Sequence, residues 1–248
     1  MTDRTVLALT GKDRIPFLQG LITNDVSKAE GGIIYAALLT PQGKYIADFF
    51  VIGENDRLLI DVATSLAPAL AQRLSMYRLR ADVQISETDL VVSRGTADAP
   101  AGAVADPRHP SLGWRLYGTD DQSDGTDWDA LRTAYLVPES GVELTPDTYI
   151  LEARFDALHG VDFKKGCYVG QEVTARMKHK TELKKGLAKV RVSGRAEPGT
   201  EITSDGKPAG ILHTVAGDEG IAYLRFDRAE GEMEAGEARL VRLPNPEP

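Results

Sequence analysis

The last quarter of the chain changes its pattern in a way that restricts the fold more than any other feature. After Lys184 the sequence becomes a series of short apolar runs separated by turn-forming residues. Evenly spaced short strands with turns between them are typical of a small antiparallel barrel. We therefore predict a β-barrel over residues 185–248, with strands at 187–192, 201–203, 208–215, 221–226 and 238–243.

The residues before Lys184 mix helical and strand periodicities. Apolar residues recur at helical spacing between 14 and 22, and again between 66 and 79. Shorter apolar runs bounded by turn residues predict strands. The predicted helices cover 14–22, 66–79, 128–136 and 150–158, and the predicted strands cover 6–9, 33–39, 45–52, 57–62, 83–85, 90–93 and 113–117. This mixture indicates an α+β fold.

The composition limits the partners and the compartment that we expect. The formal net charge is -8, and an acidic surface disfavours loose binding to nucleic acid or to anionic membranes. No apolar run approaches the ~20 residues of a membrane-spanning helix. The single cysteine excludes a disulfide within the chain, and the N-terminal residues lack the features of a signal peptide. We therefore expect a cytoplasmic protein with no direct nucleic-acid partner and no membrane partner.

The single cysteine, Cys167, lies in a glycine-punctuated segment between Gly166 and Gly170, directly after Lys164 and Lys165. Glycine permits tight turns and close approach of the backbone to a ligand. Nearby positive charge favours the thiolate, which is the nucleophile and the ligand of iron–sulfur clusters. One cysteine cannot form a closed metal site by itself. The pattern is compatible with a functional thiol and equally with an inert, buried cysteine at a turn.

A cationic segment follows the cysteine. Its cations are Arg176, Lys178, Lys180, Lys184 and Lys185, with His179 among them and Glu182 as the single acid. On an acidic protein, such a cluster indicates an anionic ligand or an acidic partner. A strand edge kept soluble by lysines would give the same pattern.

A carboxylate inside an apolar run is a further candidate. Asp48 lies within IADFF at 46–50, and burying it without a partner would be costly. Facing a cavity, it could hold the N–H groups of a ligand or act as a base. Asn24 and Asp25 are candidates as well, although both residue types also end helices. The four histidines show no metal-ligand spacing, and no metal site is predicted.

Several of these segments together resemble one family. The stretch KGCYVGQE at 165–172 resembles the K-G-C-Y-x-G-Q-E signature of the YgfZ-type folate-binding proteins and their mitochondrial iron–sulfur assembly counterparts, which are relatives of the glycine-cleavage aminomethyltransferase. The segments FLQG at 17–20, TND at 23–25, LTPQGK at 39–44 and YRLR at 77–80 are similar to those of the same family. The resemblance covers about the first three quarters of the chain.

The resemblance implies a three-lobed ring around a pterin-binding channel. Its lobes would comprise 1–42 with 128–184, then 43–127, then the barrel at 185–248. It also implies a tetrahydrofolate-type ligand, transient contact with an iron–sulfur cluster, and a role in making or repairing iron–sulfur proteins, including enzymes that modify tRNA. Cys167 would be the functional thiol. The residues expected to hold the folate are Lys165, Tyr168, Gly170, Gln171, Glu172, Arg176 and Asn24.

Three functional hypotheses follow. The favoured one is a folate-dependent accessory protein, in which a cavity holds the pterin, the basic cluster binds its acidic tail, and Cys167 acts by redox chemistry or by cluster contact. The second is aminomethyl transfer to tetrahydrofolate with Asp48 as the base. A folate-contacting glutamate of the aminomethyltransferases falls here at Ala134, which weakens that case. The third is an adaptor that binds client or assembly proteins and no folate.

Overall fold

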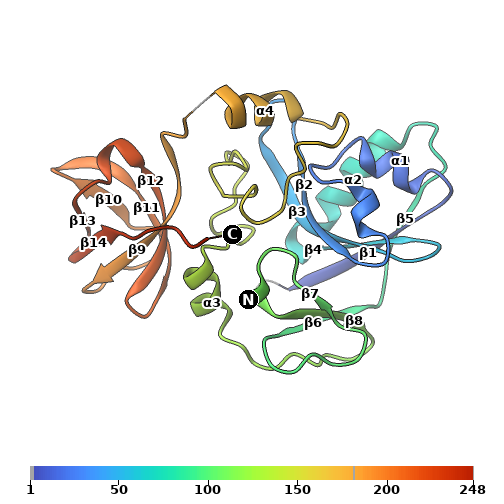
Figure 1. The fold of residues 1–248 in the computed structure, drawn as a ribbon, viewed down its shortest axis with the longest axis horizontal. Helices are drawn as coiled ribbons and strands as arrows, with labels where there is room; N and C mark the ends of the chain where they lie inside the picture. Colours follow the sequence, from blue (N-terminus) through green and yellow to red (C-terminus); the bar gives the residue numbers. More distant parts are fainter. Residues whose placement is uncertain (1–2, 181, 248) are drawn as a thin grey trace. The chain divides into compact units, whose positions relative to one another are not determined.

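The computed structural model describes residues 3–180 and 182–247 (Figure 1). The chain divides into two units. The first, called the sheet unit here, comprises Thr2–Thr126 and Phe155–Ala175. The second, the barrel unit, comprises Asp127–Arg154 and Arg176–Pro248. Each unit is therefore assembled from segments that are distant in the sequence.

The sheet unit is built on five antiparallel strands in the order β2-β3-β4-β1-β5. Their bounds are β1 Arg4–Thr10, β2 Ile33–Leu39, β3 Tyr45–Gly53, β4 Leu58–Ala63 and β5 Gln84–Glu87. Apolar side chains on alternate positions of these strands face the helices α1 (Arg14–Gln19) and α2 (Ala67–Arg78) and the short turn η1 (Val26–Ala29). This helical side of the sheet forms the main core of the unit.

The opposite side of the same sheet carries polar and aromatic residues. Tyr35 on β2 pairs with Phe50 on β3, and Phe50 pairs with Asp61 on β4, so the three residues form a row across the sheet. A second sheet of three strands, β6 (Val91–Gly95), β8 (Trp114–Gly118) and β7 (Val104–Ala105), belongs to the same unit and supplies a buried arginine to this row. The candidate site described below is built on this side.

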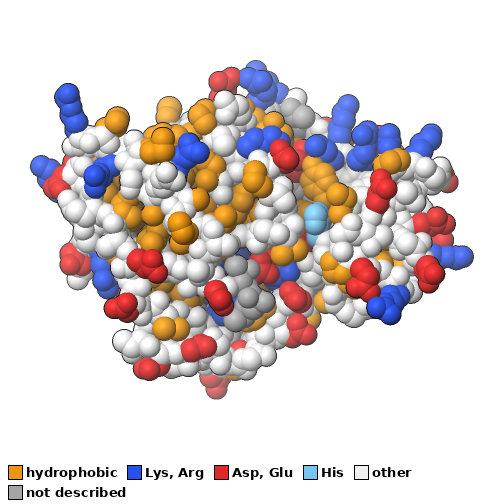
Figure 2. All heavy atoms as spheres, turned by 180° about the vertical axis from the view of Figure 1, so that it is seen from behind, with side chains coloured by type: hydrophobic (Ala, Val, Ile, Leu, Met, Phe, Trp, Pro, Cys, Tyr) orange, Lys and Arg blue, Asp and Glu red, His pale blue; other side chains and the backbone are white. Residues whose placement is uncertain are grey.

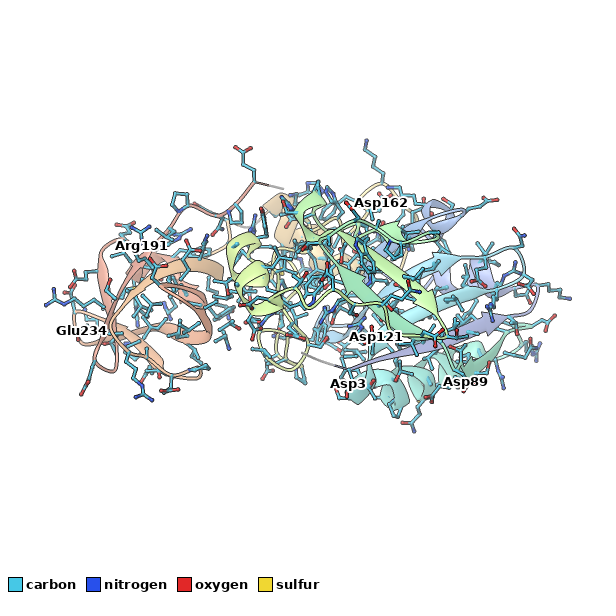
Figure 3. The ribbon with its side chains drawn as sticks, turned by 90° about the horizontal axis from the view of Figure 1, so that it is seen from below. Asp3, Asp89, Asp121, Asp162, Arg191 and Glu234 are labelled. Atoms are coloured by element: carbon cyan, nitrogen blue, oxygen red, sulfur yellow. The ribbon has the colours of Figure 1, made fainter. Side chains whose placement is uncertain are left out.

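The barrel unit contains α3 (Trp128–Tyr135) and a closed antiparallel barrel in the order β10-β11-β12-β9-β14-β13. The strand bounds are β9 Lys185–Ser193, β10 Glu201–Ser204, β11 Lys207–Ala216, β12 Glu219–Arg225, β13 Glu232–Ala235 and β14 Ala238–Arg242. Buried residues alternate with exposed charges such as Arg191 on β9 and Glu234 on β13, which Figure 3 labels on the barrel strands. The predicted α+β class and the predicted barrel are confirmed.

The structure differs from the sequence analysis at several elements, and strand β7 was among those not predicted. The predicted helix at 150–158 is wrong, because this segment is a run of turns. Arg154 within the segment and His159, which directly follows the segment, both adopt positive φ. Helix α4 (Gln171–Lys180) was not predicted, since the glycines that precede it were interpreted as a loop and its cations only as part of a basic cluster. Strand β13 was missed because it has only two apolar residues, Met233 and Ala235.

The division of the chain also differs from the predicted lobes. The predicted boundary between residues 42 and 43 falls inside the β2–β3 hairpin, whose strands pair from Ile33 with Ile52 to Leu39 with Tyr45. Strand β1 and strands β3 and β4 belong to one sheet, so 1–42 and 43–127 cannot be separate lobes. Among the described residues, no helix has both the length and the apolar character needed to cross a membrane.

Candidate functional site

The loop that carries the signature is fixed at its first residue by a buried lysine. The Lys165 ammonium group donates to the backbone carbonyl oxygens of Gln19 at 2.8 Å, Ile22 at 2.6 Å and Asn24 at 2.9 Å. Burial lowers the pKa of Lys165 to about 8, with the carboxylates of Asp25 and Asp162 acting in the opposite direction. Lys165 therefore holds the loop to the end of α1 and the segment that follows it. The three bonds use the ammonium group that a ligand would need in order to bind Lys165.

Asp162 shapes the same loop from the side. Its carboxylate accepts the backbone N–H groups of Lys164 at 2.7 Å and Lys165 at 3.2 Å, and it pairs with Lys28 at 2.8 Å (Asp162 is labelled in Figure 3). Burial opposes ionisation of this carboxyl, but Lys28 and the two backbone donors lower its pKa. The turn that leads into the cysteine is thus held by a charged side chain.

The two glycines of the signature have different roles. Gly170 has φ +85°, and a Cβ there would lie 2.7 Å from the carbonyl oxygen of Thr40, at the tip of the β2–β3 hairpin. Only glycine fits this conformation and this contact without strain. A Cβ at Gly166 would meet no atom within 4 Å, and the φ angle of Gly166 is not positive. The loop is therefore held at Lys165 and at Gly170, and it spans the residues between them.

Cys167 lies on this span and is exposed. The thiol is therefore not an inert core residue, which was one of the two interpretations of the sequence. Its neighbour Tyr168 is buried, and burial raises the pKa of Tyr168 to about 12. The loop then enters α4, where Gln171 is half-buried and Glu172 and Arg176 are exposed. The predicted folate contacts therefore differ widely in their access to solvent.

Asn24 is buried and joins two segments of the sheet unit. Its amide donates to the carbonyl oxygens of Tyr35 at 2.8 Å and His159 at 2.7 Å, and its side-chain oxygen accepts the N–H of Asp25. Its neighbour Thr23 donates to the carbonyl oxygen of Gly160 at 2.6 Å. The TND segment thus connects β2 to the segment before the signature loop, and its side chains are used for this connection.

Asp48 is buried on the polar side of the sheet, where two tyrosines hold it. Tyr35 donates its hydroxyl to one carboxylate oxygen at 2.9 Å, and Tyr45 donates to the other at 2.7 Å. Burial and the charge of Asp48 raise the pKa of Tyr35 well above its ordinary value, so its hydroxyl remains protonated and donates. Both oxygens of the predicted base are therefore engaged within the protein.

A cluster of buried charges adjoins this group. Asp61 binds Arg4 and Arg115 at 2.6 Å each, and Asp106 binds Arg108 at 2.8 Å and Arg115 at 3.4 Å. Burial opposes ionisation, yet the two arginines lower the pKa of Asp61 to about 2. The guanidinium carbons of Arg115 and Arg108 lie 3.9 and 4.8 Å from the centre of the Phe50 ring. This network attaches the three-stranded sheet to the five-stranded sheet.

A cavity of about 300 Å³ opens beside Tyr35. Its lining residues are Asn24, Lys28, Ile33, Ile34, Tyr35, Pro107, Asp156, His159 and Val161. The Tyr35 ring is fixed by stacking on Phe155 at 5.0 Å and by the close approach of Gly160, where a Cβ would lie 3.0 Å from the ring. The cavity has the size of a small ligand pocket, with apolar and aromatic walls and a few polar groups. Cys167 is not among its lining residues.

The cationic segment belongs mostly to the barrel unit. Lys178, His179 and Lys180 form the last turn of α4, where cations interact favourably with the helix dipole. Lys184 and Lys185 line a cavity of about 260 Å³ together with Glu152, Glu182 and Arg225 among others, so its walls carry both signs of charge. Figure 2, seen from behind, shows Lys and Arg side chains gathered along one edge of this unit. The assignment of the cluster to an acidic folate tail stays a prediction.

Sequence reasoning missed several residues of the buried network. Asp61 lies inside the apolar run at 58–62, which is the same signal that identified Asp48. Tyr35 and Arg115 are fully buried, but an isolated tyrosine or arginine in a predicted strand gives no warning of this. Their grouping depends on strand pairing, which periodicity alone does not supply.

Comparison with known proteins places these features in a family. A family model for the CAF17 C-terminal beta-barrel domain matches residues 184–246. The crystal structure of the glycine cleavage system aminomethyltransferase T from Bartonella henselae superimposes with a TM-score of 0.74, at 13% identity, over 97% of this chain and 82% of that chain. The iron-sulfur cluster assembly factor IBA57, mitochondrial, is 32% identical in Homo sapiens and 29% identical in Mus musculus, in each case over 97% of this chain and 81% of the relative.

The fold is thus that of the aminomethyltransferase T class, completed by a closed barrel. Within that class, the chain belongs to the family of the IBA57 iron–sulfur cluster assembly factors. The expected cytoplasmic location is wrong on this comparison, because relatives that match 97% of the chain are named as mitochondrial proteins.

Proposed function

We propose that this protein is a folate-binding factor of iron–sulfur cluster assembly that presents the Cys167 thiol to a cluster carried by a partner protein. The observation that carries the proposal is the exposed cysteine on a loop held at both ends, by Lys165 and by Gly170. A loop fixed in this way keeps the sulfur in one position, which favours binding because little conformational freedom is lost on contact.

The number of cysteines limits what the thiol can do. Clusters are commonly held by four protein ligands, and this chain can supply a single cysteine thiolate. The cluster is therefore cargo that passes through a shared site, with the remaining ligands supplied by the partner. In this exchange the thiol gives its proton to solvent, and its thiolate forms one bond to a cluster iron as one ligand of the partner leaves that iron. A single thiolate ligand supports a role in assembly, together with iron–sulfur partner proteins, and not permanent storage of a cluster.

The cavity beside Tyr35 supports the folate part of the proposal. Its apolar wall of Ile33, Ile34 and Val161 suits the face of a pterin. Asp156 and His159 supply polar groups for the ring nitrogens, and Lys28 supplies a cation for a carboxylate tail. When bound, a reduced folate supplies a reduced pterin and nitrogens that carry one-carbon groups. The KGCYVGQE signature, similar to that of YgfZ-type proteins, supports the same assignment.

The structure lends less support to aminomethyl transfer. A base must be free to accept a proton from its substrate, whereas Asp48 is 4% exposed and accepts hydroxyl groups at both oxygens. We therefore assign Asp48 to holding Tyr35 and Tyr45 in place. The wall of the cavity formed by Tyr35 would depend on this carboxylate.

Titration of the purified protein with tetrahydrofolate tests the folate part. We expect saturable binding that is lost in Val161→Trp, because the larger side chain fills the cavity, and that is retained in Cys167→Ser. Val161→Trp must keep the near-ultraviolet circular dichroism of the wild type for this comparison. Absence of saturable binding to the wild type would contradict the folate assignment and favour an adaptor that uses the thiol alone.

A further inference from the structure

Leu79, in the YRLR segment, combines two unfavourable features. Its backbone has φ 45° and ψ -105°, a conformation that leucine rarely adopts and glycine adopts readily. Its side chain is 90% exposed. A non-glycine residue in such a conformation is strained, and an exposed leucine gains no stabilisation from packing. A contact outside the chain would account for a leucine with both features.

Other exposed apolar side chains lie around it. Met76, one helical turn earlier on α2, is 64% exposed, and Ile15 on α1 is 46% exposed. The backbone of Asp82 is joined to Asp13 by hydrogen bonds of 3.2 and 2.9 Å, which place the start of α1 beside the segment that follows α2. Figure 1 shows α1 and α2 on the same side of the five-stranded sheet. Met76 and Leu79, together with Ile15 at the start of α1, are called the Leu79 surface below.

The segments that carry this surface hold more cations than acids, although the protein has a net charge of -8, and their acids are Asp13 and Asp82. The exposed cations are Lys12, Arg73, Arg78 and Arg80. Exposed Met and Arg beside a half-buried tyrosine, Tyr77, match the composition of protein–protein interfaces, where these residue types are enriched. Positive charge around an apolar centre is complementary to a partner with the opposite arrangement.

We propose that the Leu79 surface is a docking site for an acidic partner protein, with Leu79 entering an apolar pocket that is rimmed by carboxylates. The surface lies at the start of α1, whereas the carbonyl of Gln19 that Lys165 holds lies at its end. Six helical residues span about 9 Å, so a partner docked here is within reach of the signature loop. Docking requires neither the thiol nor a folate.

The first measurement separates docking from a structural role. Leu79→Gly removes the strain and the exposed side chain, so we expect the thermal midpoint to stay unchanged or to rise by about 2–4 °C. A fall of that size would show that Leu79 stabilises the fold, and the proposal would be abandoned.

The second measurement tests contact with a partner. The full chain carries p-benzoylphenylalanine in place of Met76 and is irradiated in the cells that express it, and the adducts are sequenced by mass spectrometry. We expect adducts with one protein at a segment of Asp and Glu around apolar residues. The yield should fall about tenfold in Leu79→Gly and in Arg78→Glu with Arg80→Glu, the loss expected for an interface hot spot. The control is a chain that carries the same photoreactive residue in place of Ile211, which is 44% exposed on the barrel.

Three outcomes would overturn the proposal. One is an adduct yield at position 76 no higher than at position 211. Another is a yield that neither Leu79→Gly nor the charge reversal changes. The last is sedimentation with phosphatidylcholine vesicles that contain phosphatidylserine, if the wild type sediments and Leu79→Gly does not. That result would identify a lipid surface, and not a protein, as the ligand.

Discussion

The ammonium group of Lys165 lies 2.6 Å from the backbone carbonyl oxygen of Ile22. With the bonds to Gln19 and Asn24, it joins the signature loop to the segment after α1, across more than 140 residues of sequence. The signature is therefore more than a set of ligand contacts. One of its most polar residues determines where the loop lies, and Cys167 takes its position from that loop.

Removing this ammonium group should loosen the loop. Lys165→Met leaves three carbonyl groups without their donor, and a buried acceptor without a partner costs about 1–3 kcal/mol. We expect a loss of about 2 kcal/mol in the free energy of unfolding, measured by urea denaturation. Lys164→Met is the matched control, because Lys164 is exposed and should change stability little. Equal effects of the two substitutions would contradict the anchoring role of Lys165.

The two signature glycines should differ in their tolerance of alanine. Gly170→Ala places a Cβ against Thr40 and Leu39 at positive φ, so we expect a destabilisation of about 1–3 kcal/mol. Gly166→Ala meets open space and should stay within about 0.5 kcal/mol of the wild type. Urea unfolding measures both. If the two variants unfold alike, the packing of Gly170 against the hairpin does not fix the loop.

The buried network around Asp61 predicts a specific sensitivity to acid. The folded-state pKa of about 2 lies below the ordinary 3.8, so the carboxylate contributes stability above pH 4. This contribution, about 2 kcal/mol, is lost as the pH falls from 4 to 2. We expect a smaller loss over this pH range in Asp61→Asn, which cannot ionise. The measurement is the unfolding free energy at each pH, and parallel pH profiles for the two proteins would contradict the prediction.

The features of the fold and the site that could be predicted were those whose sequence signal lies within one short segment. Most strands of the barrel and of the sheets follow from residue patterns, and the apolar run around Asp48 drew attention to a carboxylate that is buried in the structure. The same rule applied to Asp61 would have identified that carboxylate, but not the arginines that pair with it. The different roles of Gly166 and Gly170, and the three carbonyls around Lys165, depend on contacts with α1 and the β2–β3 hairpin, which are distant in sequence. Leu79 has no sequence signal for its glycine-like conformation.

The function of the thiol can be tested by the activity of iron–sulfur enzymes in cells from which this protein has been deleted. Cys167→Ser changes one exposed sulfur to oxygen and should fold like the wild type, which its unfolding midpoint verifies. We predict that this variant, expressed at the wild-type level, restores little of the iron–sulfur enzyme activity, whereas Glu182→Gln, an exposed change outside the loop, restores it fully. Full restoration by Cys167→Ser would contradict the central claim that this sulfur contacts the cluster.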